Sequence, residues 1–294
     1  MSTPIIFSIH DSDSNYWPYL AVAINSILLN SSSCHNFYIL HNETLNTEAI
    51  TNLNGLVHNK GSNLTFISVK LPSEIINLDY NRFSPASIFR LLIPKIFRNE
   101  ELVIYLDSDL IFHGIDLIEL INSASNHPIS AVVDPYIGYS IKHKKHLASF
   151  NLEIETYFNS GVLAMRPKQL PEDLINKFIY FIKNYPIQIH PDQDFLNFEF
   201  KNNWGELDRK FNHHACVMNL SLFQPISSYF NKVIHYVGAI KPLQGYIAPA
   251  FVPFWTYTNG INKIYDVFDT NKLSILFPNP SNKNDVITKI ISSQ

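Results

Sequence analysis

The feature that most constrains the fold is an alternation of short apolar strands and helical segments in the first quarter of the chain. Residues 5–9, 37–40 and 64–69 are apolar runs of strand length, and residues 19–29 and 42–57 between them have helical spacing. This β-α-β-α-β order is typical of a parallel, doubly wound sheet with helices on both faces. Right-handed crossovers bring the carboxyl ends of such strands to one edge, where open α/β sheets bind ligands. We therefore expect an α/β domain with a ligand site at that edge.

A second stretch, Leu102–Phe112, combines a buried strand with two carboxylates. Five apolar residues run into Asp107-Ser108-Asp109, after which the chain turns apolar again. Carboxylates two positions apart on an extended chain lie on the same side and reach one cation, and burying both without a partner would be very costly. Their hard oxygens suit Mg²⁺ or Mn²⁺. The pattern favours a metal site, and it leaves open a pair of exposed loop acids or a phosphatase nucleophile.

Composition excludes several other classes. The chain has only 9 glycines and contains no Gly-x-Gly-x-x-Gly or Walker-type loop, which argues against dinucleotide and P-loop phosphate cradles. The formal net charge is −3 without a long basic run, which argues against nucleic-acid binding. The two cysteines, Cys34 and Cys216, form no CxxC pair, so no disulfide framework or zinc site is expected. We find no secretory leader pattern and no apolar run of membrane-spanning length, and we expect a cytoplasmic protein.

Two further positions could complete a metal or phosphate site. His235 lies in an apolar run, where a lone histidine is more often a satisfied core residue, but a nearby pair of carboxylates makes a third-ligand role attractive. Gly238 would let the backbone approach a phosphate, and Lys241 would neutralise it. Arg90 in a mostly apolar helical segment is either exposed at its tip or bound to a carboxylate or phosphate.

Three polar or aromatic groups each allow two interpretations. Asp192-Gln193-Asp194 after a proline either caps a helix starting at Phe195 or, with Asn159, forms a hydrogen-bonding platform for a polyhydroxylated substrate. The basic tract Lys142–His146 is expected to be a solvated, mobile loop, of the kind that also closes over clefts. An aromatic group near the C-terminus either packs on the core or contacts a membrane surface near a lipid-linked acceptor; it comprises Phe251, Phe254, Trp255 and Tyr257.

Together these motifs resemble the retaining glycosyltransferases of family 8, which include bacterial lipopolysaccharide galactosyl- and glucosyltransferases and glycogenin. The resemblance rests on YLDSDLI, YFNSGVLAMRP, HPDQDFLN and HYVGAIKP and spans roughly residues 4–243. It implies a GT-A fold over residues 1–243, with a Rossmann-like, mostly parallel sheet flanked by helices, and a small C-terminal extension at 244–294. It also implies transfer of glucose or galactose from a UDP-hexose donor to an acceptor hydroxyl, in bacterial surface-glycan or glycoconjugate synthesis. The acceptor would be a glycan, a lipid-linked molecule or a protein.

The resemblance also implies roles for individual residues. The metal, Mn²⁺ with Mg²⁺ as the alternative, would be ligated by Asp107, Asp109 and His235. The catalytic candidates would be Gln193 and Asp192, and same-face attack by the acceptor is favoured over a covalent intermediate. The donor would be contacted by Ser8, Asp11, Asp13, Asn15, Tyr16, Arg90, Ser108, Asp134, Asn159, Gly238 and Lys241. Asp11 and Asp13 compete for one role at the uridine, because the stretch from His10 to Ser14 is longer than the usual family motif. Leu243 stands where the family often has Trp.

Two alternatives remain beside this assignment. A phosphatase of the haloacid-dehalogenase type also places Asp-x-Asp after a strand, but usually near the start of the chain and with Thr or Val at the position of Ile111. A catalytically silent nucleotide-sugar-binding protein is the other, although every metal-ligand position is filled. Peripheral contact with the inner face of a membrane is a further expectation.

Overall fold

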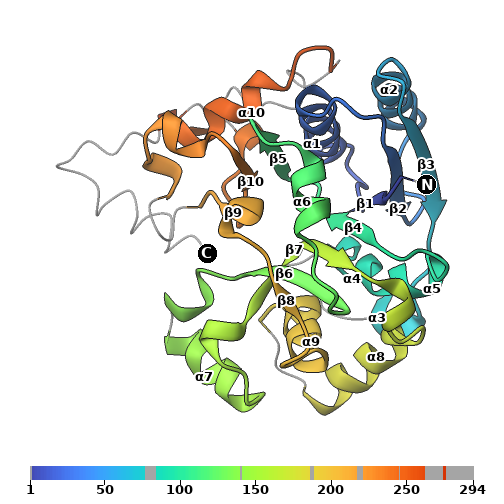
Figure 1. Ribbon diagram of the computed structural model, residues 1–294, viewed down its shortest axis with the longest axis vertical. Helices are drawn as coiled ribbons and strands as arrows, with labels where there is room; N and C mark the ends of the chain where they lie inside the picture. Colours follow the sequence, from blue (N-terminus) through green and yellow to red (C-terminus); the bar gives the residue numbers. More distant parts are fainter. Residues whose placement is uncertain are drawn as a thin grey trace.

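The computed structural model describes residues 2–76, 84–139, 141–185, 189–216, 221–244, 246–261 and 274–275. Its centre is a seven-stranded sheet with strand order β3-β2-β1-β4-β7-β6-β8 (Figure 1). The strands are β1 (Pro4–Ile9), β2 (Asn36–His41), β3 (Asn63–Ser68), β4 (Val103–Leu106), β6 (Ile129–Val133), β7 (Phe158–Met165) and β8 (Gly205–Glu206). All pairings are parallel except those of β7, which runs antiparallel to β4 and β6. The expected mostly parallel sheet is therefore confirmed.

Helices cover both faces of this sheet. The α-helices of the described part are α1 (Trp17–Asn30), α2 (Thr47–His58), α3 (Ser73–Ile76), α4 (Ala86–Phe89), α5 (Ile93–Ile96), α6 (Leu117–Ser123), α7 (Ile141–Ser149), α8 (Leu174–Asn184), α9 (Pro191–Glu199) and α10 (Val252–Thr256). Along β1, Ile5 and Phe7 belong to the core that includes α1 and α2, whereas Ile6 belongs to the core that includes α8 and α9. Successive strand residues point to opposite faces, so β1 is apolar throughout.

A second, smaller sheet positions the functional residues. It has the order β5-β10-β9, with β5 (Leu110–His113) antiparallel to β10 (Lys232–His235) and β10 parallel to β9 (His213–His214). The apolar stretch around Asp107-Ser108-Asp109 is therefore divided, because β4 before the triplet belongs to the large sheet and β5 after it to the small one. A two-residue pair, β11 (Tyr246–Ile247) with β12 (Ser274–Ile275), completes the strands of the described residues.

Two local expectations are wrong. The basic tract Lys142–His146 is not a loop, because it lies in α7, with His146 and Leu147 buried. Of the two interpretations of Asp192-Gln193-Asp194, the one that begins a helix at Phe195 is wrong, because α9 begins at Pro191 and the triplet lies within its first turn. The buried polar residues of the two helices, His146 in α7 and the triplet in α9, all have hydrogen-bond partners in the folded chain.

The part of the C-terminal extension that the structure describes packs on the core. Phe254 lies 5.7 Å from the ring of Tyr19 in α1 and 5.8 Å from that of Tyr236, between ring centroids. Asn25 Nδ2 in α1 donates to the backbone oxygen of Tyr257 at 2.7 Å. Apart from 274–275, residues beyond Ile261 lie outside the described part. Of the helices that the structure describes, none combines the length and the hydropathy that a membrane crossing requires.

Candidate active site

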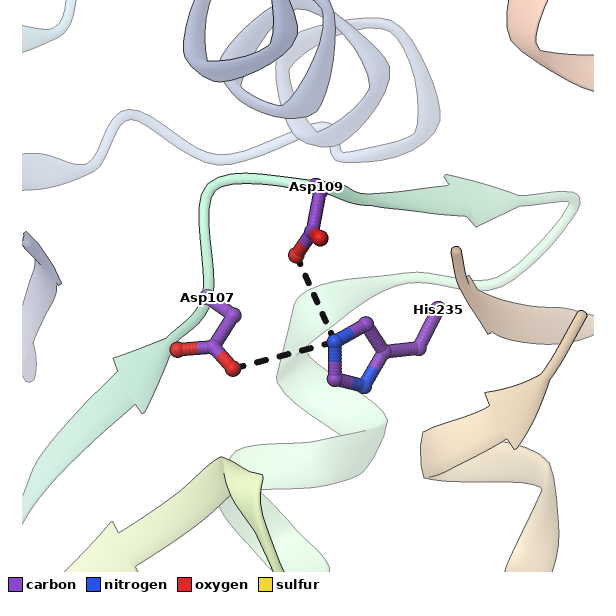
Figure 2. Close-up of side chains that lie close together, drawn as sticks. All are labelled: Asp107, Asp109 and His235. Carbon is purple, nitrogen blue, oxygen red and sulfur yellow. Dashed lines mark ion pairs between the residues drawn. The ribbon is translucent and has the colours of Figure 1, made fainter. Parts of the chain in front are cut away.

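Three side chains that can hold a metal ion meet beside the turn between β4 and β5 (Figure 2). Asp107 follows β4, Asp109 precedes β5, and His235 is the last residue of β10, so two sheets supply the ligands. One ligand atom from each residue lies within 4.8 Å of the others. His235 Nε2 is 3.7 Å from Asp107 Oδ2 and 3.3 Å from Asp109 Oδ1. Two carboxylates and an imidazole are a donor set that Mn²⁺ accepts, so these residues fit a divalent cation.

The ring of His235 is oriented by a hydrogen bond on its far side. Asn212 Oδ1 accepts from His235 Nδ1 at 2.9 Å, and Asn212 Nδ2 donates to Asn159 Oδ1 at 2.8 Å. Nδ1 of His235 therefore carries a proton, and Nε2 is the ring nitrogen that faces the carboxylates. Gly161 of β7 leaves the space for this arrangement. A Cβ atom there would lie 2.3 Å from His235 Cε1 and 2.8 Å from Asp107 Oδ2.

Two cationic side chains bind the carboxylates of the cluster. The ammonium group of Lys241 contacts the carboxylate of Asp109, and Arg90 Nη2 lies 2.8 Å from Asp107 Oδ1. Burial acts to raise the pKa of Asp109, but Lys241 and His235 outweigh burial and hold that pKa below its usual range. Asp109 is therefore ionised, as a metal ligand must be.

Arg90 is buried and is bound by carboxylate and carbonyl groups of the chain. It is 3% exposed, its Nε lies 3.4 Å from Asp192 Oδ2, and its Nη1 donates to the backbone oxygen of Ser160. Its guanidinium also lies 4.5 Å from the centre of the Tyr105 ring. The sequence left open whether Arg90 is exposed at its tip or bound to an anionic group. The structure shows it bound, to the carboxylates of Asp107 and Asp192.

A buried amide network lies beside Arg90 at the start of α9. Gln193 Oε1 accepts from Asn159 Nδ2 and from the backbone N–H of Ser160, each at 3.0 Å. Gln193 Nε2 donates to Asp134 Oδ2 at 3.0 Å. Burial acts to raise the pKa of Asp134. The nearby ring of His214, together with the hydrogen bonds that Asp134 accepts from the backbone of Tyr136 and from Asn159 and Gln193, lowers that pKa below its ordinary value. The structure thus joins Gln193, Asp134 and Asn159, which the sequence placed on three separate segments.

The residues expected near a uridine divide into buried and exposed ones. Asp11 Oδ1 accepts from the backbone N–H groups of Asn15 at 2.9 Å and Tyr16 at 3.0 Å, and Asp11 Oδ2 accepts from that of Trp17 at 2.8 Å. Asp11 therefore holds the start of α1, whose first N–H groups lack partners within the helix. Asp13 and Asn15 are exposed. Of the two competing carboxylates, Asp11 is engaged with backbone and Asp13 is open to solvent.

The remaining expected donor contacts lie around the same turn. Ser108 Oγ donates to the backbone oxygen of Ser8 at 2.8 Å, which connects the triplet to the end of β1. Lys241 Nζ lies 5.9 Å from the centre of the Tyr16 ring. Gly238 has φ +84°, and no atom lies within 4 Å of a Cβ built there, so the backbone faces open space at this residue.

Several residues of the site were not identified from the sequence. Asn212 and Gly161 orient His235, and Tyr105 Oη donates to Asp107 Oδ1 at 2.8 Å. A glycine inside an apolar strand of a glycine-poor chain was a usable signal for close approach. Neither the asparagine nor the tyrosine carried such a signal.

His214 is the fourth residue that sequence reasoning missed. It is 3% exposed, stacks on Tyr136 with ring centroids 5.1 Å apart, and meets the ring of His235 edge-on at 5.5 Å. Neither of its ring nitrogens has a hydrogen-bond partner among the described residues. Burial lowers the pKa of His214 to about 3, so the ring is neutral at pH 7.

The mixed sheet and the acidic turn at the end of β4 define an α/β protein with the GT-A fold. The model of the family described as Glycosyl transferase family 8 matches residues 8–244. A Haemophilus influenzae protein named as a glycosyltransferase is 34% identical over 215 residues, which cover 71% of this chain and 62% of that protein. The chain belongs to glycosyl transferase family 8, and the resemblance of its motifs to that family is confirmed.

Two solved structures show the same fold. The galactosyltransferase LgtC, in complex with donor and acceptor sugar analogues, superposes with a TM-score of 0.71 at 20% identity and covers 88% of this chain and 96% of that one. The bifunctional glycosyltransferase WbbM superposes with a TM-score of 0.73 at 21% identity and covers 93% of this chain and 52% of that one. At this identity the likeness concerns the fold alone.

The curated relatives extend beyond the region shared with this chain. That region is 62% of the Haemophilus influenzae protein and 40% of glycosyltransferase GlyF from Streptococcus pneumoniae, which is 26% identical over 176 residues.

Proposed function

We propose that this protein is a metal-dependent retaining glycosyltransferase that moves a hexose, glucose or galactose, from a UDP-sugar to an acceptor hydroxyl in surface-glycan synthesis. The observation that carries the proposal is the convergence of Asp107, Asp109 and His235 beside the buried network of Gln193 and Asp134. A cation-binding group next to a set of oriented amides and carboxylates suits a ligand with a diphosphate at one end and hydroxyls at the other.

The cationic groups of the site act on the leaving diphosphate. A bound Mn²⁺ would supply Lewis-acid stabilisation of the charge that develops on the leaving group. Lys241, which contacts Asp109, is placed to add a second positive charge to the same oxygens. Gly238 supports this proposal, because its backbone faces open space three residues before Lys241.

Same-face attack by the acceptor is the proposed route to retention. A double displacement needs a carboxylate that is available as a nucleophile, but Asp192 lies against Arg90 and accepts from Ser160 Oγ at 3.0 Å. Gln193 would then polarise and orient the sugar rather than form a bond to it. LgtC also has a glutamine in its active site, which a solved variant replaces by glutamate.

A screen of UDP-sugars tests the proposal directly. The protein would be incubated with UDP-glucose or UDP-galactose, with Mn²⁺, with Mg²⁺, or with a chelator, and released UDP would be measured. We expect slow UDP release from one hexose donor that requires the metal and that a suitable acceptor accelerates. Because the acceptor is unidentified, hydrolysis by water serves as the assay.

The same experiment separates the alternatives. Hydrolysis of sugar phosphates, with phosphate trapped on Asp107, would replace the proposal by a phosphatase. That reading is not favoured, because Asp107 Oδ1 already binds Arg90 and Tyr105. Binding of UDP-hexose by calorimetry without hydrolysis or transfer to any tested acceptor would instead indicate a silent nucleotide-sugar-binding protein.

A further inference from the structure

A second buried polar network, outside the metal cluster, joins α7, α9 and the start of β7. The side chain of Asp194 is 0% exposed and accepts from Tyr157 Oη at 2.7 Å and from His146 Nε2 at 2.9 Å. Asp194 Oδ2 also accepts from the backbone N–H groups of Ile189 and His190, each at 3.0 Å. These five residues form the Asp194 node, in which one carboxylate holds three segments of the chain together.

The node is adjacent in the chain to the amide network of the candidate active site. Asp194 follows Gln193 in the first turn of α9, and Tyr157 immediately precedes β7. Gln193 Oε1 accepts from Asn159 and Ser160 of that same strand. The node and Gln193 therefore hold the same two segments, α9 and the start of β7, at neighbouring positions.

The hydrogen bonds of the node involve an ionised carboxylate. Burial acts to raise the pKa of Asp194, but the hydrogen bonds from His146 and Tyr157 outweigh burial and keep that pKa below its ordinary value. Burial raises the pKa of Tyr157 far above its usual value, so its hydroxyl keeps the proton that it donates. Hydrogen bonds to a charged acceptor are stronger than those between neutral groups. Losing one of them leaves a buried charge without one of its partners, which is costly.

His146 connects α7 to this node. On α7, Lys142, Lys144 and Lys145 are exposed, whereas His146 and Leu147 are buried. His146 also lies edge-on against Phe150, with ring centroids 4.7 Å apart. Contact between α7 and the start of α9 is therefore made by His146, which binds Asp194, and by the half-buried His143, whose ring centroid lies 5.7 Å from that of His190.

We propose that His146 is a positioning residue for sugar transfer, which acts through Asp194 to hold the first turn of α9, and with it Gln193, in its reactive placement. This inference rests on the proposed glycosyltransferase function. His146 is buried and donates to Asp194. In this proposal it acts on the reaction through Asp194 and Gln193 and does not touch the substrate.

Two matched substitutions at His146 test the hydrogen bond itself. The side-chain nitrogen of glutamine reaches about as far from Cα as His Nε2, whereas that of asparagine reaches only about as far as Nδ1. We expect His146→Asn to lower UDP release from the active UDP-hexose by roughly 10- to 100-fold, the cost of a displaced catalytic group. His146→Gln should restore most of this loss. The KM for the donor should change little in either variant, because the metal cluster is unaltered.

Limited trypsin digestion gives a readout that needs no activity. The exposed lysines of α7 are cleavage sites that a docked helix protects, so His146→Asn should be cut within α7 faster than the unaltered protein, and His146→Gln at nearly the unaltered rate. Lys145→Gln, on the exposed face of α7, serves as the control and should leave UDP release unchanged.

The outcomes are distinguishable. Equal turnover in His146→Asn and the unaltered protein would overturn the inference, as would equal loss in the glutamine and asparagine variants, which would indicate a general packing role. If the unaltered protein releases no UDP from any donor, the proposed function fails and the inference falls with it. The trypsin comparison then still reports whether His146 docks α7.

Discussion

Two acidic triplets with the same spacing, Asp107-Ser108-Asp109 and Asp192-Gln193-Asp194, behave differently in the folded chain. In the first, both carboxylates converge with His235 on one place (Figure 2). In the second, the carboxylates separate, because Asp192 lies against Arg90 and Asp194 binds His146. The first triplet makes one cluster, and the second connects two networks.

The difference follows from the backbone on which each triplet lies. The first triplet lies in the turn between β4 and β5, where the chain bends so that Asp107 and Asp109 both face His235 (Figure 2). In a helix, side chains two positions apart are rotated by about 200° around the axis and point in nearly opposite directions. The convergence of Asp107 and Asp109 depends on that turn, and the helix start at Pro191 excludes such an arrangement for the second triplet.

The largest expected effect is the loss of the first cluster. Asp109→Asn should lower Mn²⁺-dependent UDP release by at least about 1,000-fold, since metal assistance contributes several kcal/mol to the transition state. Calorimetry with Mn²⁺ and UDP should show loss of metal-supported binding in the same variant. Asp173→Asn, which alters an exposed carboxylate at the start of α8, is the control for a general charge effect. Unchanged turnover in Asp109→Asn would contradict the metal assignment.

The second triplet can be divided by two substitutions. Asp194→Asn should lower the free energy of unfolding by about 3 kcal/mol, because it replaces an acceptor in a buried charged network by a donor. Asp192→Asn should cost less, about 1 kcal/mol, and mainly reduce turnover, because Arg90 keeps its contacts with Asp107 and with the backbone oxygen of Ser160. Urea unfolding and UDP release measure the two effects. Similar stability losses in both variants would remove the distinction between the two residues.

Two glycines offer a smaller test of the first cluster. Gly161→Ala should weaken Mn²⁺ binding roughly tenfold, because the added methyl group meets His235 and Asp107. Gly238→Ala is the matched control: its φ of +84° makes alanine strained, but the added atom meets nothing within 4 Å. The control should therefore lose about 1 kcal/mol of stability and keep its affinity for the metal. Equal Mn²⁺ affinities in the two variants would show that Gly161 does not shape the cluster.

The smallest effect concerns His214, whose ring contacts those of His235 and Tyr136. Its folded-state pKa of about 3 is below the ordinary value, so the unfolded chain binds its proton first as the pH falls. The stabilisation from His214 is therefore complete above its ordinary pKa and is lost progressively as the pH falls towards 3. Between pH 7 and pH 6, the metal-free protein should lose about 0.7 kcal/mol more than the His214→Phe variant, which keeps the ring stack. Parallel pH dependence of urea unfolding in both proteins would exclude this assignment.

Much of the fold was predictable because its signals are local. The apolar runs of β1, β2 and β3 and the helical spacing between them are properties of neighbouring residues, and they predicted the parallel part of the sheet. The antiparallel course of β7 was not predictable in this way, since its pairing with β4 depends on the path of the intervening chain. The helix α7 was missed because charged residues dominate its sequence, and the partners of its buried residues, such as His146, come from distant parts of the chain.

What the sequence by itself determined is the chemistry available: an acidic turn after a buried strand, a distant histidine and lysine, and a set of amides. What only the tertiary structure decided is which of these groups meet. Lys241 contacts Asp109 across 132 positions, and Asn212 reaches His235 from the residue just before β9. The tertiary structure also separated Asp192 from Asp194, because the backbone conformation at Pro191 sets the direction of each side chain. Residues at a given spacing in the sequence take definite relative positions only once the fold sets the backbone conformation as strand, turn or helix.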